Sequence, residues 1–297
     1  MSTASDSVWG ELTPRVRRRL IADRWINLLL PLLFLIVVLP LLDLIYWIAS
    51  RALPTMTLAT ITTNPEGLSG GLFAPIVGTF EIILIATLIA GTLGILAGMY
   101  TAEFAPRRIA AIGRMGGSLL AGVPAIVIGY FGYFALVLYA HWGVTLLTGA
   151  VTLSIFMLPY VYRTTDLAFQ AVPSDQRSAA LGMGATPAQY LRRVGWPIAF
   201  PRILTGVFIA MAIGLGETAP LLFTAGWNTH PAQGLSDPTS YLTGLIWLYY
   251  SAPTDFGTEL ALAFQAAFLL IVIVIVLNIV VQIVAERYRR RLRGLFR

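Results

Sequence analysis

Long apolar runs separated by short polar segments dominate the chain. Six runs reach the ~20 mostly apolar residues that a helix needs to cross a bilayer. Only three residues, His141 to Gly143, separate the third run from the fourth, which predicts a tight helical hairpin. The pattern predicts an all-α integral membrane protein with six transmembrane helices. The runs cover residues 25–50, 73–100, 116–140, 143–162, 203–226 and 259–285.

The segment 172–201 is the one long polar interruption in the second half of the chain. Ser174 is a suitable N-cap for a short helix. Thr186, Pro187 and Gln189 form a second helix start, with a capping residue, a proline at the first helical position and a glutamine three residues after the cap. We therefore expect two short helices with a bend between them, presented outside the bilayer to a soluble partner.

Composition agrees with a membrane protein and excludes several kinds of chemistry. Apolar residues make up 57% of the chain and charged residues 11%, with a mean hydropathy of +0.78. There is no cysteine for a disulfide or a metal cluster. All 20 Lys+Arg residues are arginine, so the chain has no lysine for a P-loop or a Schiff base. We expect a protein that is not an enzyme and uses no cofactor or metal, with energy supplied by another chain or an ion gradient.

The arginines predict the orientation. They lie within 1–24, 107–114, 163–202 and 287–297, and only Arg51 falls on the opposite side of the spans. By the positive-inside rule, both termini and the 172–201 segment are cytoplasmic. Charges that flank spans in this way also argue against nucleic-acid binding, despite the formal net charge of +6.

The same pattern predicts the organisation of the chain. We expect a basic cytoplasmic segment at 1–24, held at the anionic leaflet, and a first transmembrane helix with an outer loop at 25–72. The apolar run of that helix is about twice a signal-peptide core of ~7–15 residues, so we interpret it as a retained anchor. A transmembrane core follows at 73–285, including the 172–201 segment, and a basic cytoplasmic tail at 286–297.

Two interrupted spans carry the candidate functional residues. Pro124 and Gly129 lie in LAGVPAIVIGYFG, which indicates either close helix packing or a broken helix that lines a pathway. Glu217 lies in GLGETAPLLFTAG, where burying its charge would cost at least ~2.5 kcal/mol. It is either a pathway residue, a protonated acid, or the partner of an arginine in a neighbouring subunit. Glu81 and Asn278 are weaker candidates.

The 172–201 segment resembles the cytoplasmic loop of ABC-transporter permeases. That loop has the pattern EAA, three residues, Gly, nine residues, Ile, one residue, Leu-Pro. The matching residues here are Ser178, Ala179, Ala180, Gly184, Val194, Trp196 and Pro197. More narrowly, VPSDQRSAALGMGATPAQ, LAGVPAIVIG, GTF and GETAPLLFTAG resemble the phosphate-importer permeases of the PstA type, over roughly residues 72–285.

The resemblance implies a subunit of a type I ATP-driven phosphate importer in the bacterial inner membrane. Its partners would be a second permease of the PstC type, two ATPase subunits of the PstB type and an external phosphate-binding protein of the PstS type. The implied ATPase-coupling residues are Arg177, Ser178, Ala179, Ala180, Gly184, Ala185 and Pro197. The implied translocation residues are Glu217, Thr218, Pro220, Pro124 and Gly129.

Two positions depart from the family pattern. Ser178 replaces the usual glutamate of the loop, and Ile213 stands where relatives commonly have an arginine. Anion handling would then fall to the partner permease, to helix N-termini or to backbone amides. The alternatives are a permease for molybdate, tungstate or sulfate, and a secondary transporter that acts alone. A membrane enzyme would need a catalytic cluster that this sequence lacks.

Overall fold

The computed structural model describes residues 14–66, 70–251, 253 and 257–295, and these residues contain helices and no strand. The chain divides into two compact units between Arg51 and Ala52. The described part of the first unit belongs to helix α1 (Pro14–Ala52), whose segment Leu29–Ala52 is long and apolar enough to cross a membrane. Residues 1–13 of the predicted basic segment 1–24 lie outside the described residues, and residues 14–24 belong to α1.

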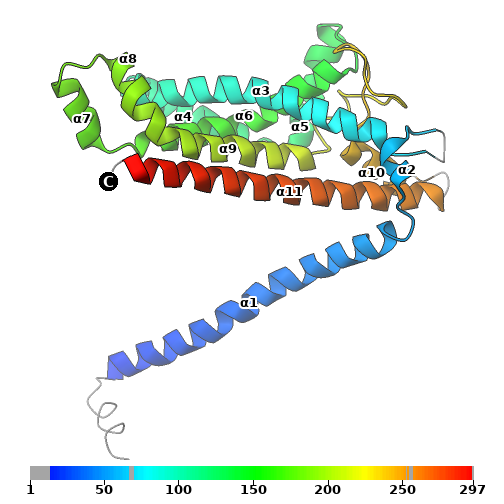
Figure 1. The fold of residues 1–297 in the computed structure, drawn as a ribbon, viewed down its shortest axis with the longest axis horizontal. Helices are drawn as coiled ribbons and strands as arrows, with labels where there is room; N and C mark the ends of the chain where they lie inside the picture. The colour runs from blue at the N-terminus through cyan, green and yellow to red at the C-terminus, as the bar shows by residue number, and fades with distance from the viewer. Residues whose placement is uncertain (1–13, 67–69, 252, 254–256, 296–297) are drawn as a thin grey trace, which may run out of the picture. The chain divides into compact units, whose positions relative to one another are not determined.

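Four long helices build the second unit (Figure 1). Helix α3 (Phe73–Glu103) packs most extensively on α6 (Leu146–Gln170), which also packs on α9 (Trp196–Gly216). Helix α11 (Thr258–Leu295) lies against α9. With α1, five segments of the described chain therefore satisfy the length and apolarity of a membrane span, and the all-α prediction is confirmed.

The predicted third span, 116–140, is wrong as a continuous helix. Helix α4 (Arg107–Ala121) ends before Pro124, and α5 (Ala125–Gly132) with the π-helix η1 (Tyr133–Tyr139) follows at an angle of 96°. Pro124 has φ −56° and ψ 135°, outside the helical region. Proline has no N–H for the helix ladder, and its ring also disfavours helical geometry in the residue before it. The proline in this span therefore breaks the helix.

The predicted fifth span, 203–226, is also wrong at its end. Helix α9 stops at Gly216, because Glu217 adopts an extended conformation with ψ 132°. A turn follows and closes at Gly226, whose φ of +86° is left-handed. The chain then forms α10 (Leu242–Ser251), between the fifth and sixth predicted spans. The apolar residues after Gly216 thus form a turn rather than the end of a spanning helix.

The two-helix prediction for 172–201 is confirmed in part. Helix α7 (Ser174–Gly182) is followed by α8 (Pro187–Tyr190), and the capping box is present: Thr186 Oγ1 accepts from the Gln189 N–H at 3.3 Å. Pro173, not Ser174, is the N-cap of α7. Helix α8 is a single turn that continues through the π-helix η2 (Leu191–Gly195) into α9.

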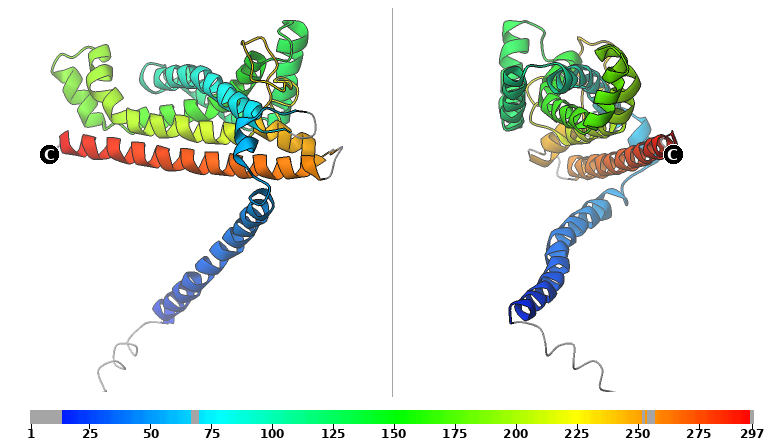
Figure 2. Two further views of the ribbon diagram at one scale, coloured as in Figure 1. Left: turned by 45° about the vertical axis from the view of Figure 1, so that its right-hand side comes forward. Right: turned by 90° about the vertical axis from the view of Figure 1, so that its left-hand side faces the viewer.

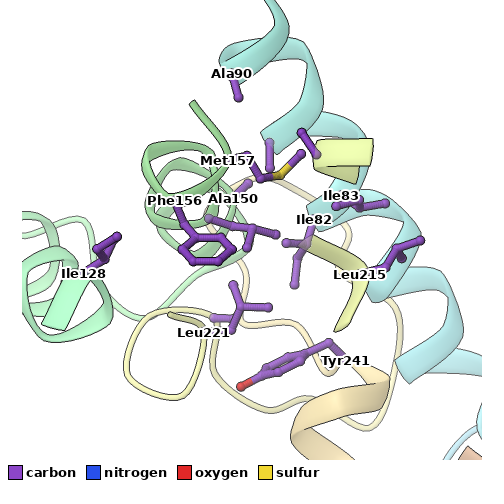
Figure 3. Packing of buried hydrophobic residues seen from close by; sticks show 14 of the residues in the cluster. Ile82, Ile83, Ala90, Ile128, Ala150, Phe156, Met157, Leu215, Leu221 and Tyr241 are labelled. Atoms are coloured by element: carbon purple, nitrogen blue, oxygen red, sulfur yellow. The ribbon is translucent and has the colours of Figure 1, made fainter. Parts of the chain in front are cut away.

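Small residues allow α3 and α6 to pack closely. A methyl group added at Gly94 would lie 2.8 Å from the Val161 Cβ, and one at Gly98 would lie 2.6 Å from the Tyr162 carbonyl oxygen. The apolar side chains of the core, which include Ile82, pack around the contact between α3 and α6 (Figure 3). Glycines at these two positions therefore let the backbones of α3 and α6 approach each other.

The hairpin predicted around His141 is also confirmed. His141 and Gly143 take φ values of 58° and 74°, which turn the chain between η1 and α6. Helix α6 then runs past the predicted end at residue 162 and finishes at Gln170. Arg163 and Asp166 are consequently helical residues rather than loop residues.

The arginines gather at one end of the second unit. Helices α7 and α8 project at the end where α3 finishes and where the C-terminal turns of α11 lie (Figures 1 and 2). Helix α4 begins there with Arg107 and Arg108, immediately after the end of α3. Helices α2 (Leu58–Thr62) and α10 lie at the opposite end. The described structure thus separates an arginine-rich end from an end poor in basic residues.

Candidate coupling elbow and translocation region

The elbow, residues 172–201, presents small and apolar side chains at its tip. Ser178 and Ala179 are exposed on α7, whereas Ala180 is buried. Leu181 and Met183 are 39% and 84% exposed, although both are apolar. A tip of small residues beside exposed apolar ones is suited to seating in a groove of another protein.

Gly184 makes the bend of the elbow. Its φ of +86° lies in the left-handed region, and no atom lies within 4 Å of where a Cβ would stand. The next residue closes the bend, because the Ala185 N–H donates to the Ala180 carbonyl at 3.1 Å. At the other end of the elbow, Pro197 is the second residue of α9 and directly follows the π-helix η2 in a continuous helical run.

A buried acid connects the elbow to the end of α3. The Glu103 carboxylate accepts from the Arg177 guanidinium at 3.2 Å and from the Tyr190 hydroxyl at 3.4 Å. Arg177 also lies over the Tyr190 ring, 5.6 Å from its centre. The side chain of Glu103 is only 5% exposed. This Glu103 clasp holds both α7 and α8 against α3, and no pattern in the sequence indicated it.

Two of the predicted translocation residues are in contact. A methyl group added at Gly129 of α5 would lie 2.6 Å from the Ala219 carbonyl oxygen and 2.9 Å from the Pro220 Cα. Glycine is therefore required where α5 crosses the turn after α9. Pro124 stands more than one helical turn earlier, at the bend between α4 and α5.

Glu217 and Thr218 begin the same turn. The Glu217 carbonyl accepts from the Thr243 hydroxyl at 3.0 Å, and the Thr218 carbonyl accepts from the Leu221 N–H at 3.1 Å. The half-buried side chain of Glu217 lines a small cavity with Thr79. Among the described residues, no arginine forms an ion pair with this carboxylate. Ile213, one turn before, packs against the core cluster.

The two weaker candidates, Asn278 and Glu81, lie outside this turn. Asn278 donates to the Val274 carbonyl of its own helix at 2.8 Å, rather than across helices. The Glu81 Oε2 is buried and has no hydrogen-bond partner within the described part of the chain. Nothing in the structure connects Glu81 with the turn that follows α9.

A second ion pair was also missed from the sequence. Arg114 of α4 binds Asp166 of α6 through two nitrogens, with Nε–Oδ2 at 2.9 Å and Nη2–Oδ1 at 3.1 Å. Asp166 is 3% exposed, so this is a fork-shaped pair to a buried carboxylate. An acid inside an apolar run was the only signal, and it did not identify the partner, which lies 52 residues away.

Comparisons with known proteins agree with this architecture. Residues 94–294 match the family described as binding-protein-dependent transport system inner membrane component. A phosphate transport system permease protein, PstA 2 of Mycobacterium tuberculosis, is 39% identical over 238 residues, covering 80% of this chain and 78% of that protein. A probable phosphate transport system permease protein of Methanocaldococcus jannaschii is 32% identical over 256 residues, covering 85% and 90%.

Solved structures share the fold at low sequence identity. The methionine ABC transporter MetNI, in an inward facing conformation, is similar with a TM-score of 0.61 at 16% identity, covering 73% of this chain and 95% of that chain. An amino acid ABC transporter gives a TM-score of 0.52 at 21% identity, covering 71% and 92%. Together with the family match over most of the second unit, these findings show that the chain belongs to the family of inner membrane components of binding-protein-dependent transport systems.

Proposed function

We propose that this chain is a multi-pass permease subunit of an ATP-driven importer of inorganic phosphate in the bacterial plasma membrane. The observation that carries the proposal is the similarity to phosphate transport permeases at 32–39% identity over most of both chains. The elbow and the broken α4–α5 segment support it, because they supply a docking element and an interrupted helix in one molecule. The subunit itself performs no ATP hydrolysis, which falls to a separate chain.

The elbow couples the permease to an ATPase subunit. Its exposed small residues seat in a groove of the ATPase, and closure of the nucleotide sites moves the elbow. The Glu103 clasp supports this role, because it ties both elbow helices to a long helix of the core. Met183 supports it as well, since an apolar side chain 84% exposed at the tip is suited to burial against a partner.

The turn after α9 and the start of α5 line the pathway together with a second permease. Glu217 repels an anionic cargo unless a cation neutralises it, so an arginine of the second permease is its expected partner. Since Ile213 is packed in the core, this chain places no guanidinium at that point of the pathway. An external phosphate-binding protein delivers the cargo, and both termini of the chain are cytoplasmic.

Uptake measurements test the proposal and its competitor. A host lacking its own permease pair is supplied with this chain and its genomic neighbours, and uptake of labelled phosphate is measured. We expect ATP-dependent uptake that excess unlabelled phosphate abolishes and that sulfate, molybdate and tungstate leave unchanged. Absence of labelled phosphate uptake, together with ATP-dependent uptake of labelled sulfate, molybdate or tungstate, would assign the other cargo.

A further inference from the structure

A cavity of about 160 Å³ lies between α4 and α6, away from the turn that follows α9. Its lining includes the guanidinium groups of Arg114 and Arg163, the hydroxyl of Ser118 and the amide of Gln170. Both helices contribute polar side chains to this cavity. Neither the elbow nor the proposed pathway uses these groups.

The cavity carries one positive charge in excess. Asp166 neutralises Arg114, and it occupies the Nε and one Nη of that guanidinium. Arg163 has no acidic partner among the described residues; its Nη1 donates only to the Ser118 hydroxyl, at 3.4 Å. A guanidinium has five N–H donors, so both arginines retain donors that can be directed to a ligand.

The two helices that line the cavity pack closely beside it. A methyl group added at Gly117 would lie 2.7 Å from the Tyr162 ring, and one at Gly113 would lie 3.0 Å from the Tyr162 hydroxyl. The α4 backbone therefore rests directly on α6 beside the cavity. The buried Asp166 carboxylate also fixes Arg114, so this guanidinium needs little reorganisation to bind a ligand.

We propose that this cavity binds a single phosphate group. Planar guanidinium forks match phosphate oxygens in geometry and charge, and the hydroxyl and amide add neutral donors. The group has two possible sources: free inorganic phosphate, or the headgroup of an anionic lipid, which basic pockets between membrane helices recognise. The inference rests on the cavity alone and does not depend on the proposed cargo.

Thermal unfolding of the full-length chain in detergent, with bound lipid removed, tests the site. One arm adds inorganic phosphate at constant ionic strength, with chloride as the reference. The other arm adds phosphatidylglycerol, with phosphatidylcholine as the reference. A rise in Tm with phosphate alone, with phosphatidylglycerol alone or with both supports the site and identifies the source. No rise in either arm overturns the proposal.

Variants assign the effect to the cavity. We expect Arg163→Ala to weaken the apparent affinity at least about tenfold, since a charged fork is removed. Arg202→Ala, which removes an exposed arginine outside the cavity, should bind as the wild type does. Arg114→Ala is unsuitable, because it leaves Asp166 buried without a partner.

A second variant guards against a folding defect in the first. Gln170→Glu places a negative charge at an exposed position of the lining without disturbing the helix contact, and it should also abolish the rise in Tm. Wild-type affinity in both Arg163→Ala and Gln170→Glu would refute the site. The Tm measurement uses the purified chain and does not involve transport. Ligand binding at the cavity together with failed phosphate uptake would therefore contradict the proposed cargo and leave the proposed site intact.

Discussion

At the scale of single residues, Gly129 is the position where one added methyl group has the clearest consequence. In Gly129→Ala, the Cβ meets backbone atoms of the turn that cannot rotate away. We expect a loss of about 1–3 kcal/mol in the free energy of unfolding and a lower rate of phosphate uptake. Gly116→Ala is the matched control, because no atom lies within 4 Å of the added methyl. Equal stability of the two variants in chemical unfolding would contradict the packing argument.

The Glu103 clasp predicts a coupling defect rather than an assembly defect. Glu103→Gln removes the charge that holds Arg177 but keeps an acceptor for the Tyr190 hydroxyl. We expect several-fold less phosphate transported per ATP hydrolysed in reconstituted vesicles, with normal recovery of the ATPase subunit. Tyr190→Phe, which loses only a 3.4 Å hydrogen bond, should show a smaller effect. An unchanged transport ratio in Glu103→Gln would mean that the clasp is only structural.

Glu217 predicts an effect that depends on the second permease. Removing one member of a desolvated ion pair typically costs about 3–5 kcal/mol. Glu217→Gln should therefore reduce phosphate uptake without preventing membrane insertion. Loss of the paired arginine as well should restore co-purification of the two permeases better than either single change. Full uptake in Glu217→Gln would exclude a role for this carboxylate in the pathway.

At the scale of elements, the elbow depends on the backbone of Gly184. A non-glycine residue at its φ of +86° is strained by about 1–2 kcal/mol, although space is available. Gly184→Ala should therefore weaken binding of the ATPase subunit in co-purification. The control is Gly182→Ala, which places its methyl in equally open space within α7. Loss of binding in both variants would indicate crowding of the surface instead of a strained bend.

Local chemistry made some elements predictable and left others out of reach. The start of α8 was predictable, because Thr186 and Gln189 satisfy each other within four residues. The end of α9 was not predictable, because the residues after Gly216 are apolar enough to continue a span but form a turn. Pro124 was recognised as an interruption, but a 96° bend depends on what α5 packs against. Hydropathy indicates which residues prefer to leave water, and it does not distinguish a helix from an apolar turn.

The candidate site was predictable as a set of positions and not as a set of contacts. Family strings marked Gly129 and Pro220, and the structure brings them together. The pairs that hold the site, Glu103 with Arg177 and Arg114 with Asp166, join residues 74 and 52 positions apart. No periodicity links residues so distant, and a single charge in an apolar run does not identify its partner.

At the scale of the whole molecule, the arrangement of arginines predicts the topology. The chain has no cysteine, so single cysteines report their own exposure. With an impermeant thiol reagent added to cells, we expect labelling of Thr62→Cys and Gly234→Cys and none of Ala111→Cys or Ser178→Cys. All four positions are exposed in the structure, so packing within the described chain does not shield them from the reagent. External labelling of Ser178→Cys would reverse the orientation and exclude the elbow as an ATPase contact.

Helix α3 connects the elbow with the cavity that Glu217 lines. Glu103 ends it at the elbow, and toward its other end Thr79 Oγ1 accepts from the Leu242 N–H at 2.9 Å and lines the cavity of Glu217. These two residues are separated by roughly 36 Å of continuous helix, at about 1.5 Å per residue. A continuous helix resists compression along its axis, so movement of one end shifts the other end. We therefore expect a displacement applied to the Glu103 clasp to be transmitted along α3 to the cavity that Glu217 lines.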